Sequence, residues 1–233
     1  MHPLKTAGSA AVVAAALCLL AFPGPAAAYF TDDSLVRVVY DSRGSGEVAT
    51  DLGQVRDLVS QVNLRVGYGP DAFSLEMFDH PGYGQASWAD LRVGYLAGGL
   101  AADGIWLPGF GGRLETSQVG DVQREMGTVL DFYAQFGTAT VGPGGSSSHS
   151  FAYLLSSVSG QVSLQSLQNR GYVDQYLFYW SAAEAGEGVQ VAVLRTMADG
   201  STIINPVPVP ASGLLLLGSS LGLGGIRARR RQA

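Results

Sequence analysis

The chain has 233 residues, of which 47% are hydrophobic and only 14% are charged, and this composition excludes a charge-rich disordered protein. Residues 29–206 contain all 19 acidic residues and nine arginines, so their net charge is 9 − 19 = −10, and the only lysine of the chain is Lys5. An acidic body without lysine excludes nucleic acid as a partner and favours cations, neutral sugars or other proteins. The single cysteine, Cys18, leaves that body without a disulfide or a thiolate metal site.

The N-terminus has the pattern of a secretory signal peptide. Lys5 provides a short basic start, and residues 10–22 form an apolar run of 13 residues, which is short for a membrane-spanning helix. Ala26 and Ala28 place small residues at positions −3 and −1 of a cleavage site. We therefore predict that residues 1–28 are a signal peptide, removed by signal peptidase before Tyr29; the alternative is a permanent N-terminal anchor.

The body begins with a predicted β-hairpin. The β-branched residues of 34–40 favour a strand, the glycine- and serine-rich residues 41–46 favour a turn, and residues 47–51 form the returning strand.

A five-residue repeat follows. Leu-Arg-Val-Gly-Tyr occurs at residues 64–68 and again at residues 91–95. We interpret the copies as two similar strands of one sheet; the alternative is a repeat architecture. The alternation of a strand predicts that the leucines and valines face the core and that both arginines face outward, namely Leu64, Val66, Leu91 and Val93 inward, and Arg65 and Arg92 outward.

One helix is indicated by an apolar stripe with helical spacing. We expect it to start at a capping Asp121 and to end at Gly137. A second, shorter helix is predicted for residues 150–157. The stripe consists of Val122, Met126, Val129, Leu130, Tyr133 and Phe136.

The end of the body is predicted to be β-structure. Residues 172–180 are a long aromatic strand, residues 189–193 alternate with period two, and Asp199-Gly200 is a hairpin turn into residues 201–204. Together these elements predict one α+β domain over residues 29–206, mainly antiparallel β, with a β-sandwich-like arrangement and one or two helices packed on it.

No catalytic motif is found in the body, so we assign no catalytic, cofactor-binding or metal-binding residue and expect a protein that is not an enzyme. The histidines of the body, His80 and His149, lie in turn-like or loop-like sequence, and no nucleophile elbow is present. Calcium remains an alternative because oxygen ligands suffice for it, with Asp32, Asp33 and Asp199 as candidates.

A sugar-directed function is also open at the sequence level. Paired carboxylates can hydrolyse glycosides, but 19 acidic residues do not single out a pair. Aromatic rings can stack on sugar faces or pack in a β core. The aromatic candidates are Trp88, Trp106, Tyr176, Tyr179 and Trp180.

The C-terminal 27 residues fall into three parts, a stiff Pro-containing segment 207–212, an uncharged apolar segment 213–226 and a basic end 227–233. Proline keeps the first part extended. A helix over residues 211–226 would be about 24 Å long, which is short of a ~30 Å hydrocarbon layer. The arginines predict that the end stays in the cytoplasm while the body lies outside. They are Arg227, Arg229, Arg230 and Arg231.

This tail resembles the PEP-CTERM sorting signal of Gram-negative bacteria, in which a Val-Pro-x-Pro motif precedes a short apolar helix and an arginine-rich end. The corresponding stretches are VPVPAS, GLLLLGSSLGLGGI and RARRR. The tail departs from the usual pattern at Val209, where the family mostly has glutamate. The sorting motif consists of Val207, Pro208, Val209, Pro210 and Ala211.

The resemblance implies recognition by an exosortase, a membrane-embedded cysteine transpeptidase-like enzyme that cleaves near the motif. It implies export, transient anchoring in the inner membrane, and then a place at the cell surface or outside the cell. The body itself resembles a recurrent group of exported PEP-CTERM proteins without an established activity. The matching stretches are LVRVVYDSRGSGEVATDLG, SWADLRVGYLA, GYVDQYLFYW and VLRTMADGSTIINP.

We therefore expect a structural or matrix-associated protein of a biofilm-forming bacterium, with exopolysaccharide or other matrix proteins as partners. One alternative is a polysaccharide-binding module, which an exposed row of aromatic rings would favour. Another is a glycosidase-like secreted hydrolase, which two inward carboxylates in a cleft would favour.

Overall fold

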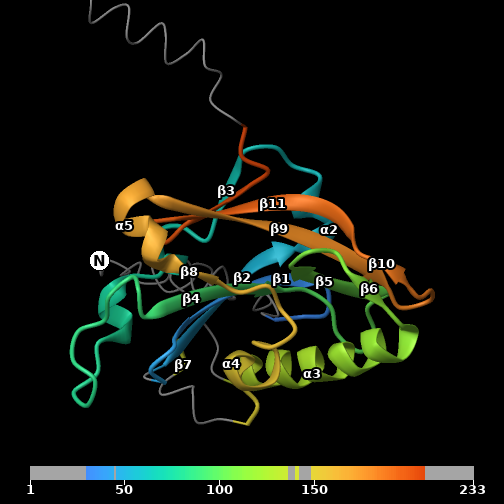
Figure 1. The fold of residues 1–233 in the computed structure, drawn as a ribbon, viewed down its shortest axis with the longest axis horizontal. Helices are drawn as coiled ribbons and strands as arrows, with labels where there is room; N and C mark the ends of the chain where they lie inside the picture. The colour runs from blue at the N-terminus through green and yellow to red at the C-terminus, as the bar shows by residue number, and fades with distance from the viewer. Residues whose placement is uncertain (1–29, 45, 136–139, 142–147, 208–233) are drawn as a thin grey trace, which may run out of the picture.

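The computed structural model describes residues 30–44, 46–135, 140–141 and 148–207 of the chain. Its architecture is mainly antiparallel β with a few helices, as predicted (Figure 1). The first five-stranded sheet has the order β7-β2-β1-β4-β8, the second has the order β3-β12-β11-β9-β5, and a small two-stranded sheet pairs β10 with β6. Every pair of neighbouring strands is antiparallel.

The strands follow one another along the chain in short hairpins and longer crossovers. Their bounds are β1 Ser34–Asp41, β2 Glu47–Gln54, β3 Leu64–Val66, β4 Leu91–Leu96, β5 Gly104–Pro108, β6 Arg113–Leu114, β7 Thr140–Val141, β8 Val162–Ser163, β9 Tyr172–Ser181, β10 Gly186–Glu187, β11 Val189–Met197 and β12 Thr202–Ile204. The α-helices are α2 Val55–Val59, α3 Thr116–Ala134, α4 Phe151–Leu154 and α5 Leu167–Arg170, and short 3₁₀ turns cover Gly69–Asp71, Leu75–Phe78 and Leu164–Ser166.

The sheets and the long helix form three layers. In Figure 1, β9 and β11 lie above the first sheet, and α3 runs along the opposite side of that sheet. All eight residues of β1 are buried because this central strand is covered on both faces. Leu35 and Val39 belong to the core between the sheets, whereas Val36 and Val38 belong to the core under α3. The period of two along β1 therefore serves two separate cores.

The predicted hairpins are confirmed. β1 pairs with β2 in the first hairpin, and β11 pairs with β12 across the Asp199-Gly200 turn. The aromatic strand predicted for residues 172–180 is β9, which pairs with both β11 and β5.

The long helix is confirmed, but its predicted start is wrong. The predicted stripe is buried from Val122 to Tyr133, and Val119 extends it by one turn. The helix begins five residues before Asp121, at Thr116, because Gln118 Oε1 accepts a hydrogen bond from the Glu115 backbone N–H (2.9 Å) in a capping-box arrangement. The predicted end at Gly137, and Phe136 with it, lie outside the described residues. The second helix, α4, is shorter than predicted, with Ser150 as its N-cap.

The two Leu-Arg-Val-Gly-Tyr copies lie in different sheets, and the prediction that they share one sheet is wrong. Leu91 and Val93 of β4 are fully buried, and Leu64 and Val66 of β3 are partly buried against the same core. The side-chain alternation is as predicted at Arg65, which is exposed, whereas Arg92 is half-buried. The two copies therefore lie on opposite sides of the core. The repeat reflects a shared pattern of burial and not adjacent positions in one sheet.

A charged side chain lies in the core between the sheets. Arg37 of β1 has 0% exposure. Its guanidinium donates to Gly200 O (2.6 Å), to Asp71 O (2.8 Å), to Thr202 Oγ1 (3.1 Å) and to Thr50 Oγ1 (3.2 Å). Burial lowers the pKa of Arg37, but a guanidinium still keeps its proton at any physiological pH.

The same region carries a second polar link between the sheets. The Tyr95 hydroxyl of β4 lies 2.7 Å from Thr196 Oγ1 and 2.9 Å from Thr202 Oγ1. The Arg37 guanidinium also lies over the Phe73 ring, 5.0 Å from its centroid. Arg37 and Tyr95 thus tie the first sheet to β11, β12 and the turn between them.

Replacing Arg37 with leucine should destabilise the fold strongly. The change leaves three buried acceptors and the partly buried Asp71 carbonyl without their donor, so we expect the free energy of unfolding to fall by about 3–5 kcal/mol. Urea unfolding measures this loss, and Arg170→Leu on the exposed face of α5 is the control, expected to change it by under about 0.5 kcal/mol. A loss below about 1 kcal/mol for Arg37→Leu would contradict this view of the core.

A buried carboxylate lies on the other side of the first sheet. Glu47, at the start of β2, is 1% exposed, and its Oε2 accepts a hydrogen bond from the Ala152 backbone N–H (3.2 Å). Tyr133 of α3 and Ser150 at the cap of α4 lie around the carboxylate. Burial raises the pKa of Glu47, and the surrounding hydrogen bonds only partly offset this effect.

Glu47→Gln should stabilise the protein at neutral pH. Because the folded state raises the pKa of Glu47, ionisation costs stability as the pH rises above the unfolded value of about 4.3, and the neutral glutamine avoids that cost. We expect a melting temperature about 2–4 °C higher than that of the unchanged chain at pH 7, and no difference below about pH 4. Thermal unfolding across this pH range is the measurement. The exposed Glu76→Gln is the control, and a gain that persists at low pH would refute the role given to Glu47.

Candidate functional site

A cleft of about 600 Å³ lies beside the first half of α3. One wall is α3, the opposite wall is the loop after β5, and the segment 157–160 forms one end. Its lining residues are Leu107–Leu114, Gln118, Asp121, Val122, Glu125, Ser157–Gly160 and Trp180.

The loop after β5, which forms one wall of the cleft, lies directly on two aromatic rings. Gly111 has φ +65°, and a Cβ there would lie 2.6 Å from the Phe178 ring, so the position requires glycine. The indole N–H of Trp180 donates to Gly112 O (2.8 Å). Trp180 is 8% exposed and its ring supports the loop from below. The pair of rings thus determines the position of the loop.

The end of the cleft is held by a close backbone contact. The Gly160 N–H donates to Pro108 O (2.7 Å), and a Cβ at Gly160 would lie 2.7 Å from that oxygen. This approach is possible only for glycine. It joins the segment after α4 to the end of β5, so the cleft is closed there by backbone rather than by long side chains.

Phe110 is the most exposed large hydrophobic residue of the described chain, with a relative exposure of 103%. Its glycine neighbours place it at the tip of the loop. It lines the cleft on one side and, on the other, a second hollow of about 210 Å³ that also contains Asp174 and Tyr176. Tyr176 is 54% exposed on the outer face of β9. An apolar ring therefore stands between two adjoining hollows, in a place where it contributes nothing to the core.

The helix wall supplies the charged groups of the cleft. Gln118, Asp121 and Glu125 lie on one face of α3, and Asp121 pairs with Arg124 (3.1 Å) outside the cleft lining. On the loop wall, Arg113 pairs with Glu115 (3.1 Å). Both carboxylates among the lining residues, those of Asp121 and Glu125, therefore come from the same wall.

This combination suits a carbohydrate ligand. An exposed aromatic ring can stack on the apolar face of a sugar, while carboxylates and backbone groups bind its hydroxyls. The cleft is open to solvent, so a sugar unit can enter it from outside without reaching the core.

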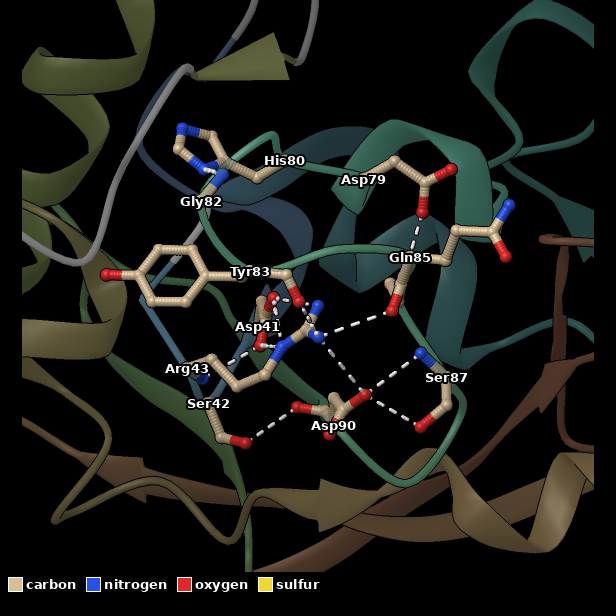
Figure 2. Close-up of polar contacts among 11 residues, drawn as sticks. Asp41, Ser42, Arg43, Asp79, His80, Gly82, Tyr83, Gln85, Ser87 and Asp90 are labelled. Atoms are coloured by element: carbon tan, nitrogen blue, oxygen red, sulfur yellow. Dashed lines mark hydrogen bonds and ion pairs between the residues drawn. The ribbon is translucent and has the colours of Figure 1, made fainter.

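The histidines considered in the sequence lie elsewhere. His80 is in a turn, where its Nδ1 accepts a hydrogen bond from the Gly82 N–H (3.0 Å). Figure 2 shows its ring on the far side of this loop from the Arg43 guanidinium. His149 stacks on Phe132 near the end of α3, whereas the cleft is formed by the first half of that helix.

The loop around His80 is organised by Arg43. Its guanidinium makes a 2.8 Å ion pair with Asp41, lies 3.7 Å from Asp90, and donates to the carbonyl oxygens of Tyr83 and Gln85 (Figure 2). A side chain that already bears a positive charge thus occupies the space between these carboxylates. The cluster joins the β1–β2 turn to residues 79–90 and has a structural role.

The calcium candidates are not brought together. Asp199 pairs with Arg65 and accepts from Ser201, while Asp32 Oδ2 accepts from the Ala101 N–H (3.0 Å). Asp33 lies near Arg56, and its burial raises its pKa. Within the part of the chain that the structure describes, three or more acidic, histidine or cysteine side chains nowhere form a group suited to a metal ion.

The aromatic candidates separate into core and surface. Trp106 is buried between the sheets, and Trp88 and Tyr179 pack against that core. Tyr176 is exposed, and Trp180 forms the floor of the cleft. Phe110 is not among the aromatic residues predicted from the sequence. The signal that could have found it is its position in Pro-Gly-Phe-Gly-Gly, since a bulky ring surrounded by turn residues has no strand or helix to place it in a core.

The processing sites lie almost wholly outside the described residues. The predicted cleavage residues Ala26, Ala28 and Tyr29, the motif from Pro208 onward and the terminal arginines are not among them; Val207 is described and is 52% exposed. Across residues 30–207 as described, no helix combines the length and hydropathy needed to cross a membrane. The predicted short helix of residues 213–226 falls outside that range.

No family model, no curated protein and no solved structure matches the chain.

Proposed function

We propose that this chain is an exported, matrix-associated protein whose body binds polysaccharide through the cleft between α3 and the loop after β5. Its C-terminal segment acts as an exosortase sorting signal, and the mature body functions at the cell surface or outside the cell.

The exposure of Phe110 carries the binding part of this proposal. Exposing a phenylalanine ring completely is unfavourable, and burying it would gain about 1.5–3 kcal/mol. A ligand that stacks on the ring recovers this energy. The second hollow with Tyr176 continues the surface beyond Phe110, so a chain of linked sugars can contact both rings.

The arrangement of the carboxylates favours binding over hydrolysis. A glycosidase places its two carboxyl groups on either side of the scissile bond. Here both carboxylates of the cleft lining belong to α3, and the opposite wall is formed by backbone, Phe110 and Arg113. We therefore propose a binding protein and not a glycoside hydrolase.

The sorting part of the proposal is supported by the two ends of the sequence. Both predict the same orientation, with the body outside the inner membrane and the terminal arginines inside. A short apolar segment rich in glycine suits a temporary anchor better than a permanent one.

Phe110→Ala should weaken polysaccharide binding about five- to fiftyfold, because one aromatic stacking contact is lost. The measurement is affinity electrophoresis or calorimetry of the mature protein with exopolysaccharide from a biofilm-forming host. Tyr68→Ala removes another exposed ring (60% exposed) outside the cleft and is the control. Equal weakening by both variants, or by neither, would contradict the cleft as the binding site.

Replacing Pro208 and Pro210 with alanine should leave unprocessed protein at the inner membrane, because the motif loses its extended shape. Deletion of residues 227–231 should have the same effect by removing the basic stop. Mass determination of the chain from membrane, cell-surface and medium fractions is the measurement, in hosts with and without exosortase. Mature surface protein that still carries residues 229–233 would show that the tail is a plain anchor.

A further inference from the structure

We propose that the cleft selects cationic amino sugars, with the ammonium group of a hexosamine unit placed against the Glu125 carboxylate. This inference rests on the proposed function and names the chemical class of its ligand.

Glu125 differs from the other charged groups around the cleft. It is half-buried, it lines the cleft, and its carboxylate has no hydrogen bond or ion pair among the residues that the structure describes. Asp121 is paired with Arg124, and Arg113 is paired with Glu115. Because the charges of each ion pair offset one another, the carboxylate of Glu125 is the negative charge that remains on the wall of the cleft.

The charged side chain of the opposite wall, Arg113, is already paired with Glu115. The rest of that wall is the glycine-rich loop, with Phe110 at its tip, and residues 157–160 at one end of the cleft provide backbone, serine and valine groups. A sugar bound in the cleft can therefore contact Phe110 on one wall and Glu125 on the other. A neutral sugar satisfies only the first of these contacts, whereas an amino sugar satisfies both.

The charge of the whole body supports the same choice. Residues 29–206 carry 9 − 19 = −10, so a cationic polymer is attracted from a distance and an anionic one is repelled. The attraction is screened by salt, whereas stacking on the ring is not. Salt dependence therefore separates the two contributions.

The preference can be measured with three oligosaccharides of equal length, made of glucosamine, N-acetylglucosamine or a uronic acid, and the mature protein in a calorimeter below the pKa of the amine. We expect glucosamine oligomers to bind about three- to tenfold more tightly than N-acetylglucosamine oligomers, and uronic acid oligomers to bind most weakly. Added salt should reduce the advantage of the glucosamine oligomer.

The critical variant is Glu125→Gln, which preserves size and hydrogen-bonding capacity but removes the charge. It should abolish the preference for glucosamine and leave binding of the N-acetylated oligomer unchanged. Asp131→Asn makes the same charge change on α3 outside the cleft lining and should keep the preference. An unchanged melting temperature for both variants shows that the fold is retained.

The outcomes separate this inference from the function on which it rests. If all three oligomers bind equally, or if the preference survives Glu125→Gln, the amino-sugar inference fails while saccharide binding stands. If none of the oligomers binds and Phe110→Ala has no effect with natural exopolysaccharide, the proposed function fails as well, and the inference with it.

Discussion

The guanidinium of Arg37 lies inside the core between two sheets, and its hydrogen bonds determine how those sheets meet. A buried charge is tolerated only when its donors are satisfied. The Arg37 guanidinium therefore requires acceptors within hydrogen-bonding distance, and these are supplied by the turn at Gly200, by strands β2 and β12 and by the carbonyl of Asp71. Apolar contacts alone are non-directional and would permit the sheets to slide. The polar network with Tyr95 restricts them to one register.

With its interior filled by apolar and polar contacts, the body presents its hollows on the outside. The cleft arises where the loop after β5 crosses the rings of Phe178 and Trp180 and meets the segment at Gly160. Glycines allow these close approaches. Phe110, which lies between these glycines, stays outside the packed structure. The groups that form the cleft therefore come from β5, α3, β9 and the segment after α4, and none of these elements forms it alone.

Several elements could be predicted because their signals are local. The alternation in β1 and β9, the Asp-Gly turn before β12 and the apolar stripe of α3 each depend on neighbours within a few residues. The true start of α3 lies before its apolar stripe, because the residues of its first turn are polar and only the Glu115–Gln118 cap marks it. The repeat at β3 and β4 predicted the buried faces correctly and the shared sheet wrongly, since a burial pattern does not specify a strand's partner.

By itself, the sequence determined the β-rich class of the body, its acidic charge, the hairpins and the helical stripe, and it carries the export and sorting signals as predictions. The tertiary structure alone decided that Arg37 lies inside and Phe110 outside, and that Asp121 and Glu125 share the wall of a cleft. The physical reason is that hydrophobicity and period describe which face of an element is buried, whereas the position of a single charged or aromatic side chain depends on which segments pack across from it. Those segments are distant in sequence, so only the folded chain brings them together.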